Sequence, residues 1–129
     1  MNCLIDIDYI DDFYEELHCK IMKARRNWRC CECSTMIPKG NEHEVFVGKI
    51  DNRINTHRTC LTCISIRSKF LCSWVFEGIY ENISDALDNE FGLEECILSR
   101  CTLEEYNKLS TMISSLGDKD EDFNERMLI

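Results

Sequence analysis

The spacing of apolar residues near the N-terminus predicts a helix over Ile7–Lys23. Phe13, Leu17 and Ile21 recur at every fourth position, and Tyr9 stands one turn earlier, so all of them would share one face of a helix. Acidic residues gather at the start of this segment and basic residues at its end, which suits the helix dipole. We therefore expect an amphipathic helix here.

The segment Glu42–Arg58 shows the alternating pattern of a β-hairpin. Val45 and Val47 alternate with polar neighbours on the first arm, and the second arm alternates in the same way, as half-buried strands do. Asp51 and Asn52 lie between the arms, and both residue types favour tight turns. A two-stranded antiparallel unit is therefore predicted.

Between Cys60 and Tyr80, apolar residues are too frequent for a helix with one exposed face. We predict a helix over this stretch and expect it to form the spine of the hydrophobic core.

Two further helices and a tail are predicted in the C-terminal part of the chain. A short helix capped by Asn82 or Ser84 should run through Phe91 and end at Gly92. Thr102 and Glu105 stand three positions apart and form a capping box, which should begin a last helix that Gly117 ends. Residues 118–129 are rich in acidic side chains and are predicted to form a mobile tail.

Length and composition indicate one domain, residues 1–129, with 44% hydrophobic residues and a net charge of -9. No stretch reaches the roughly 18 to 20 apolar residues of a membrane helix, and the N-terminus does not have the pattern of a signal peptide. We therefore expect a cytoplasmic protein with no membrane partner. Cytosolic thiols stay reduced, so the ten cysteines suggest metal binding before disulfides.

Two cysteine pairs have the spacing of a metal site. Cys30 and Cys33 form one pair, and Cys60 and Cys63 form the other, each with two residues between its members. That spacing lets one tight turn direct two sulfurs at one ion, and four thiolates are a ligand set of structural zinc. We predict one structural Zn²⁺ held by these four residues.

Other ligands stay open from the sequence alone. Cys31 is an alternative to Cys30, and His57 lies close enough in the sequence to the second pair to compete. Cys96 and Cys101, with one more ligand, are candidates for a second metal site, although small core cysteines are the simpler interpretation.

The segment 26–70 resembles the treble-clef zinc fingers of small, uncharacterised phage and prophage proteins. The residues that carry the resemblance are Cys30, Cys33, Ile37, Lys39, Gly40, Thr59, Cys60, Cys63 and Arg67. The resemblance implies a zinc turn, a hairpin and a helix, and a phage origin, but no reaction. Together with the predicted helices, it implies an α+β fold in which a treble-clef-like module is embedded in a mostly helical domain.

Charge divides the chain into a basic middle and acidic flanks. Residues 23–69 contain ten basic and four acidic side chains, whereas the rest contains five and twenty. Our leading hypothesis is a zinc-stabilised protein that occupies a surface of a host protein or complex in the bacterial cytosol. Host-takeover and anti-defence inhibitors, such as anti-CRISPR proteins, are examples of that class. The candidate partner-binding residues are Asp85, Asp88, Glu90, Glu94, Glu95, Glu104 and Glu105.

The alternative hypothesis is nucleic-acid binding by the basic middle. Arginines would contact phosphates and Trp28 would stack on a base. The candidate residues are Arg25, Arg26, Arg29, Arg53, Arg58 and Arg67.

Enzymatic activity is the least favoured hypothesis from the sequence. Four cysteines close the metal site, whereas a catalytic zinc needs an open position. The sequence also has no His-Glu-x-x-His, phosphate-binding glycine loop or deaminase motif. A homodimer is a further expectation, because Trp74, Phe76 and Ile79 could extend the apolar surface beyond one small core.

Overall fold

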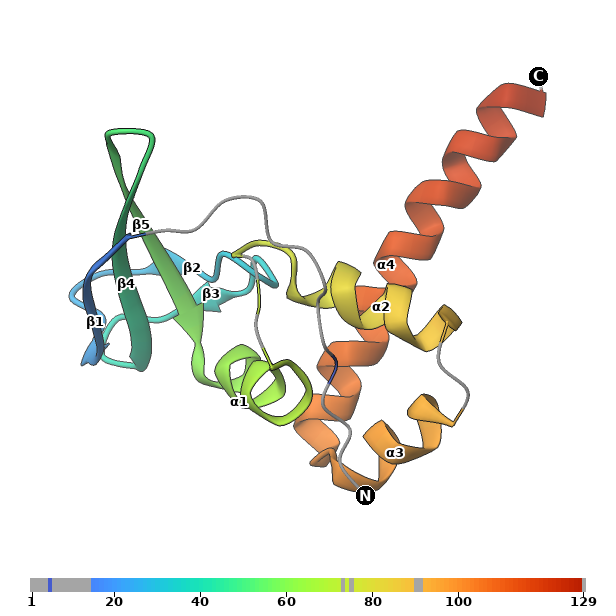
Figure 1. Ribbon diagram of the computed structural model, residues 1–129, viewed down its shortest axis with the longest axis horizontal. Helices are drawn as coiled ribbons and strands as arrows, with labels where there is room; N and C mark the ends of the chain where they lie inside the picture. The colour runs from blue at the N-terminus through green and yellow to red at the C-terminus, as the bar shows by residue number, and fades with distance from the viewer. Residues whose placement is uncertain (1–4, 6–14, 73, 75, 90–91, 129) are drawn as a thin grey trace.

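The computed structural model describes residue 5 and residues 15–72, 74, 76–89 and 92–128, with backbone alone for 117–128. The fold is α+β, with strands on one side of the molecule and helices on the other (Figure 1). No helix in this described part of the chain combines the length and hydrophobicity that crossing a membrane requires.

Three strands form the larger sheet, in the order β1-β4-β5. They are β1 (Glu15–Lys23), β4 (Glu42–Ile50) and β5 (Arg53–Cys60), and both pairings are antiparallel. The predicted hairpin is confirmed as β4 and β5. Asp51 and Asn52 connect them with φ values of 50° and 62°, which is the left-handed conformation of a tight hairpin turn.

The predicted helix over Ile7–Lys23 is wrong where the structure describes it, because Glu15–Lys23 is the strand β1. A spacing of four residues places side chains on one face of a helix, but it also places them on one face of a strand. Leu17 and Ile21 fit both patterns, and pairing with β4 decides between them. The sheet is therefore larger than the hairpin we expected.

Four helices follow the sheet: α1 (Leu61–Phe70), α2 (Ile79–Asn89), α3 (Leu93–Arg100) and α4 (Leu103–Leu128). The helix predicted from Cys60 to Tyr80 ends at Phe70 instead, and α2 corresponds to the predicted short helix but starts earlier, at Ile79. Leu71 is extended, with φ -118° and ψ 128°, and it forms a parallel bridge with Ile5. A bridge to a distant segment replaces the next helical turn, which local spacing does not reveal.

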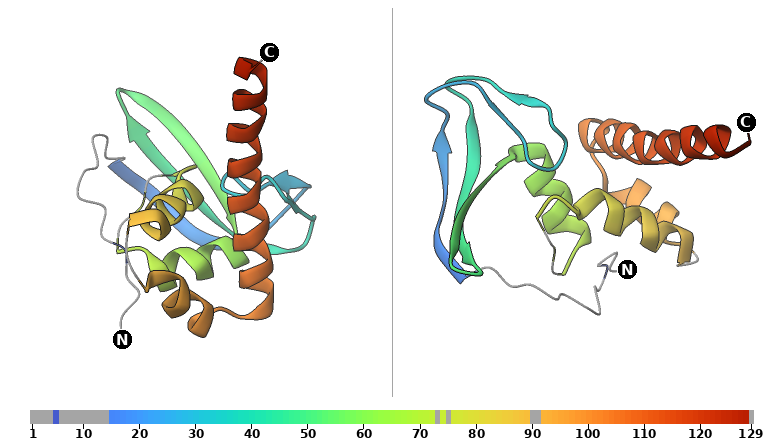
Figure 2. Two further views of the ribbon diagram at one scale, coloured as in Figure 1. Left: turned by 90° about the vertical axis from the view of Figure 1, so that its right-hand side faces the viewer. Right: turned by 90° about the horizontal axis from the view of Figure 1, so that it is seen from above.

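Helix α4 starts as predicted and ends later than predicted. The backbone N–H of Glu105 donates to the Thr102 hydroxyl at 3.2 Å, and the Thr102 N–H donates to the Glu105 carboxylate at 2.9 Å. The capping box is confirmed by these bonds. The backbone stays helical through Gly117 to Leu128, and this end extends beyond the other helices (Figure 2). The mobility of the tail stays a prediction.

The hydrophobic core lies among the helices rather than in the sheet. Ile66 and Phe70 of α1 and Ile79 and Ile83 of α2 are fully buried. Among the described residues of the large sheet, Val45 is the one hydrophobic side chain in the buried class. The sheet therefore needs another source of stability, and the metal centre lies where it joins the helices.

Candidate metal centre

The first cysteine pair lies on a turn between two short strands, β2 (Trp28–Arg29) and β3 (Met36–Ile37). The N–H of Ser34 donates to the Cys30 carbonyl at 3.0 Å, and Ser34 is left-handed with φ 62°. The turn is tied to the large sheet by the N–H of Cys31, which donates to the Arg58 carbonyl at 2.8 Å.

The second pair lies where β5 becomes α1. Cys60 ends the strand with an extended backbone and occupies the N-cap position, and Cys63 lies in the first helical turn. The N-terminal end of a helix dipole favours negative charge. A thiolate at Cys63, which is fully buried, is therefore stabilised there.

The four sulfurs converge on one point. The Sγ atoms of Cys30, Cys33, Cys60 and Cys63 all lie within 4.8 Å of one another. The Cys30–Cys63 and Cys33–Cys60 distances are 3.8 Å and 3.9 Å. A tetrahedron with metal–sulfur bonds of about 2.3 Å has edges of about 3.8 Å. The donor set and its spacing therefore fit one metal ion of the zinc class.

The protonation of the four thiols is shared within the cluster. Hydrogen bonding with Cys30 lowers the pKa of Cys33, and it lowers the pKa of Cys60 to about 6. Hydrogen bonding with other sulfurs of the cluster raises the pKa of Cys30 and Cys63. The cluster thus holds negative charge on closely spaced sulfurs, and a divalent cation can take the place of the shared protons.

Every sulfur also has a hydrogen-bond partner outside the four cysteines. Cys30 accepts from the backbone N–H groups of Glu32 and Cys60, both at 3.4 Å. The Tyr80 hydroxyl lies 2.9 Å from the Cys63 sulfur. Donors to thiolates of this kind orient metal ligands and tune the site.

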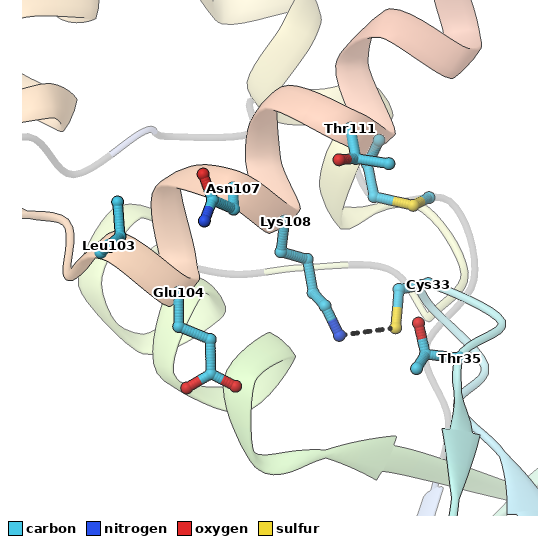
Figure 3. Close-up of a pocket in the computed structure, with 8 residues that line it drawn as sticks. Cys33, Thr35, Leu103, Glu104, Asn107, Lys108 and Thr111 are labelled. Carbon is cyan, nitrogen blue, oxygen red and sulfur yellow. Dashed lines mark hydrogen bonds between the residues drawn. The ribbon is translucent and has the colours of Figure 1, made fainter.

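The donor to the other two sulfurs is Lys108 of α4. Its Nζ lies 3.2 Å from the Cys33 sulfur and 3.7 Å from the Cys60 sulfur. Figure 3 shows Lys108 reaching from the helix toward Cys33 across a cavity of about 530 Å³. Neither Lys108 nor Tyr80 was singled out from the sequence, because nothing local marks a lysine or tyrosine as a neighbour of a distant cysteine.

A carboxylate within the first cysteine turn fixes the start of α2. Glu32 is buried, and its oxygens accept from the N–H groups of Glu77 at 2.8 Å and Ile79 at 3.3 Å. The Ile79 N–H is one of the unpaired donors of the first turn of α2, and Glu77 lies two residues before that helix. Burial raises the pKa of Glu32, and these hydrogen bonds oppose that rise. The turn that holds two ligands therefore also positions a helix of the core.

The alternative ligands lie outside the cluster. The Cys31 sulfur lies 3.5 Å from the Thr59 hydroxyl and 3.5 Å from the Glu32 carboxylate, and burial raises its pKa to about 12. His57 stacks on Phe76 with ring centroids 4.3 Å apart.

In the described part of the chain, the four-cysteine group is the one cluster of side chains that could hold a metal ion. Cys96 is disulfide-bonded, so it offers no free thiolate. The expectation of reduced thiols is therefore wrong at Cys96, whereas Cys101 is a half-buried free thiol.

The candidate partner-binding carboxylates divide into exposed and structural ones. Glu105 is buried, and its carboxylate accepts from Lys69 at 2.6 Å and from Ser65 at 2.9 Å. It therefore fastens α4 to α1. Glu104 is exposed but accepts from Thr62 at 2.9 Å. Glu90 lies outside the described residues. The carboxylates exposed on α2 and α3 are Asp85, Asp88, Glu94 and Glu95.

The arginines proposed to bind nucleic acid also divide into a buried, structural one and exposed ones. Arg67 is buried in an ion pair with Glu44 at 2.6 Å, and its guanidinium lies 4.2 Å from the ring centroid of Trp74. The exposed ones are Arg25, Arg26, Arg29 and Arg53, and Arg58 is half-buried.

Trp28, the side chain predicted to stack on a base, is already in contact with two arginines. The guanidiniums of Arg26 and Arg58 lie 3.9 Å and 3.8 Å from the Trp28 ring centroid. Both guanidiniums therefore make cation–π contacts with the indole.

The apolar residues considered for a dimer surface pack largely within the chain. Ile79 is fully buried, and Phe76 contacts Phe46 and His57. Trp74 is 37% exposed. A homodimer stays a prediction.

No protein-family model matches this chain, and no curated protein or solved structure matches it either. The resemblance to phage treble-clef proteins therefore stays a prediction that rests on the cysteine pattern.

Proposed function

We propose that this chain is a zinc-stabilised binding protein whose one metal ion is structural. The convergence of four cysteine sulfurs within 4.8 Å carries the proposal. Four protein ligands satisfy tetrahedral zinc and leave no position for a water or substrate, so the activity belongs to the surfaces around the metal. The order of a cysteine turn, a hairpin and a helix supports a treble-clef-like module.

The partner we favour is a host protein with a basic patch. Asp85, Asp88, Glu94 and Glu95 are exposed on α2 and α3. Complementary charge steers such encounters and selects among partners. If the chain is encoded by a phage, as the resemblance implies, inhibition of a host or anti-phage complex in the bacterial cytosol follows as the biological role.

Affinity capture from a host lysate tests this proposal. The variant neutralises the four carboxylates (Asp85→Asn, Asp88→Asn, Glu94→Gln and Glu95→Gln), and a matched control neutralises Arg25, Arg26 and Arg29 to glutamine. We expect the wild type and the arginine control to capture the same protein and the carboxylate variant to lose it. Undiminished capture by the carboxylate variant would contradict the proposal.

Nucleic-acid binding is the second candidate, and the arginine cluster around Trp28 favours it. A cavity of about 320 Å³ is lined by Trp28, Arg29, Cys31, Thr56 and Arg58. Because two guanidiniums already contact the Trp28 ring, the arginines rather than a stacked base would make the contact, through phosphates. Fluorescence anisotropy with DNA and RNA oligonucleotides tests this, since phosphate binding weakens steeply as salt rises. Absence of binding at low salt removes this candidate.

A further inference from the structure

The four sulfurs receive their hydrogen bonds from two different parts of the molecule. The cysteine turn and β5 supply the backbone donors to Cys30. The other sulfurs are contacted by side chains of α2 and α4: the Tyr80 hydroxyl lies beside Cys63, and Lys108 donates to Cys33 and Cys60. The set of donors is therefore complete only when the helices are docked.

The position of Lys108 is set by its helix rather than by chance contact. The Thr102–Glu105 capping box fixes where α4 begins, and Leu109, the residue after Lys108, is buried in the core. Among the described carboxylates, none lies within 4.0 Å of the Lys108 Nζ. The Lys108 ammonium group is thus directed at sulfur, and no described carboxylate competes for it.

The position of Tyr80 is similarly constrained. Its neighbours Ile79 and Ile83 are fully buried, and Tyr80 itself is 4% exposed. A metal-bound thiolate carries no proton, so in the loaded site the tyrosine O–H must donate to the Cys63 sulfur. With the Cys63 side chain fully buried, water cannot replace that donor.

Charge gives these donors their importance. Four thiolates around Zn²⁺ carry a net charge of about -2, and burying such charge is unfavourable unless it is paired and hydrogen-bonded. The Lys108 ammonium cancels one unit beside Cys33 and Cys60. Outer partners of metal ligands commonly change metal affinity by about 10-fold to 100-fold.

We propose that Lys108 and Tyr80 are positioning residues of the metal centre, which hold its thiolates as hydrogen-bond acceptors and make metal retention depend on the docking of α2 and α4. This inference rests on the proposed zinc site. It adds that the helices are part of the site rather than a separate layer.

Zinc transfer from the purified full-length chain to a chromophoric chelator tests the inference. The variants are Lys108→Met, Lys108→Arg and Tyr80→Phe, and Lys20→Met on the exposed strand β1 is the matched control. We expect Lys108→Met to retain zinc about 10-fold to 100-fold more weakly than wild type. Tyr80→Phe should move in the same direction by less, Lys108→Arg should recover most of the loss because it keeps charge and donors, and Lys20→Met should equal wild type.

Replacing zinc with Co²⁺ provides a second measurement, the absorption spectrum of the metal site. This spectrum would not change if Lys108 and Tyr80 only stabilised the fold. The sulfur-to-cobalt absorption band reports the electron density on the thiolates, so it should shift in Lys108→Met and Tyr80→Phe and not in Lys20→Met. If Lys108→Met does not fold, the same absorption band in Tyr80→Phe and Lys108→Arg tests whether these two side chains act on the metal centre. Retention and spectra equal to the Lys20→Met control would overturn the inference while leaving the zinc site intact. A wild-type chain that binds no zinc would instead overturn the proposed function, and this inference with it.

Discussion

The sheet and the helices of this protein are stabilised in different ways. The helices share a core of fully buried apolar side chains, including Ile66, Phe70 and Ile79. The buried side chains of the sheet are largely polar and include His43, Glu44, His57 and Thr59. Apolar burial stabilises by about 25 cal/mol per Å², so the sheet gains little from it. The difference teaches that the sheet depends on something other than an apolar core, and the proposed metal ion would supply it.

The largest effect should come from removing a metal ligand. Cys63→Ser leaves the site with three sulfurs, and structural zinc contributes roughly 10 to 16 kcal/mol in zinc-finger peptides. We expect loss of bound zinc by native mass spectrometry and loss of hydrogen-exchange protection in β4 and β5 before α2 and α3. Cys19→Ser, a free and exposed cysteine, should behave as wild type.

The predicted loss of protection in the sheet before the helices tests whether the two regions are stabilised differently. Equal loss of protection in sheet and helices would show that the two regions unfold as one unit. A soluble Cys63→Ser protein that melts cooperatively without zinc would contradict the structural role of the metal.

The next largest effect should come from the ion pair that joins the two regions. Arg67 of α1 and Glu44 of β4 are both buried, with side-chain exposures of 4% and 11%. Removing one partner leaves an unpaired buried charge, which destabilises by about 3 to 5 kcal/mol. Arg67→Met should therefore lower the free energy of unfolding by that amount in chemical denaturation, and Arg67→Met/Glu44→Gln by less. A double variant no more stable than the single one would argue against the pairing.

A smaller effect is expected within the helices, at Glu105. Burial alone would raise its pKa, but hydrogen bonds from Lys69 and Thr102 lower it from 4.5 to about 2. Lys69 is partly exposed, so solvent screening reduces the stabilisation to about 2 kcal/mol. Glu105→Gln should lose that amount at neutral pH, whereas Glu104→Gln, which keeps the capping box, should lose less.

The pH dependence of the Glu105 effect has a defined sign. A carboxyl whose pKa is lowered by folding stabilises fully above its unfolded pKa, and this is lost as pH falls through its folded pKa. The difference in the free energy of unfolding between wild type and Glu105→Gln should therefore be constant above about pH 4.5 and shrink toward pH 2. Subtracting the two proteins removes the loss of metal in acid, which both share. A difference that grows as pH falls would disprove this sign.

The smallest effect should be a gain in stability from changing the turn of the β4–β5 hairpin. Asp51 and Asn52 both have left-handed backbones, and Asn-Gly is the favoured pair for such turns. Asp51→Asn/Asn52→Gly should raise the free energy of unfolding by up to about 1 kcal/mol, measured by thermal denaturation with zinc present. The same gain in metal-free protein would show that the hairpin persists without zinc and would weaken the contrast between the two regions.

The sequence predicted local chemistry well and long-range pairing poorly. The cysteine pairs, the Asp51–Asn52 turn and the Thr102–Glu105 box depend on residues near one another in the chain, and each has the predicted geometry. The strand β1 was missed because its spacing also suits a helix, and only β4 supplies its hydrogen bonds.

The misplaced start of α2 has the same kind of cause. The N–H of its first residue, Ile79, donates to Glu32 of the cysteine turn, 47 positions away. Lys108 likewise meets Cys33 from 75 positions away. No short motif encodes contacts of that kind.

The separation of the two cysteine pairs along the chain has a consequence for the speed of folding. Cys33 and Cys60 stand 27 positions apart, and the proposed metal ion would close the loop that contains the hairpin. Closing a loop of that size removes about 3.5 kcal/mol of chain entropy from the unfolded ensemble by the relation used for disulfides. Because the ion must capture both ends, refolding should accelerate with free zinc concentration, and the abundance of the ion in the cell would set how soon a new chain becomes active.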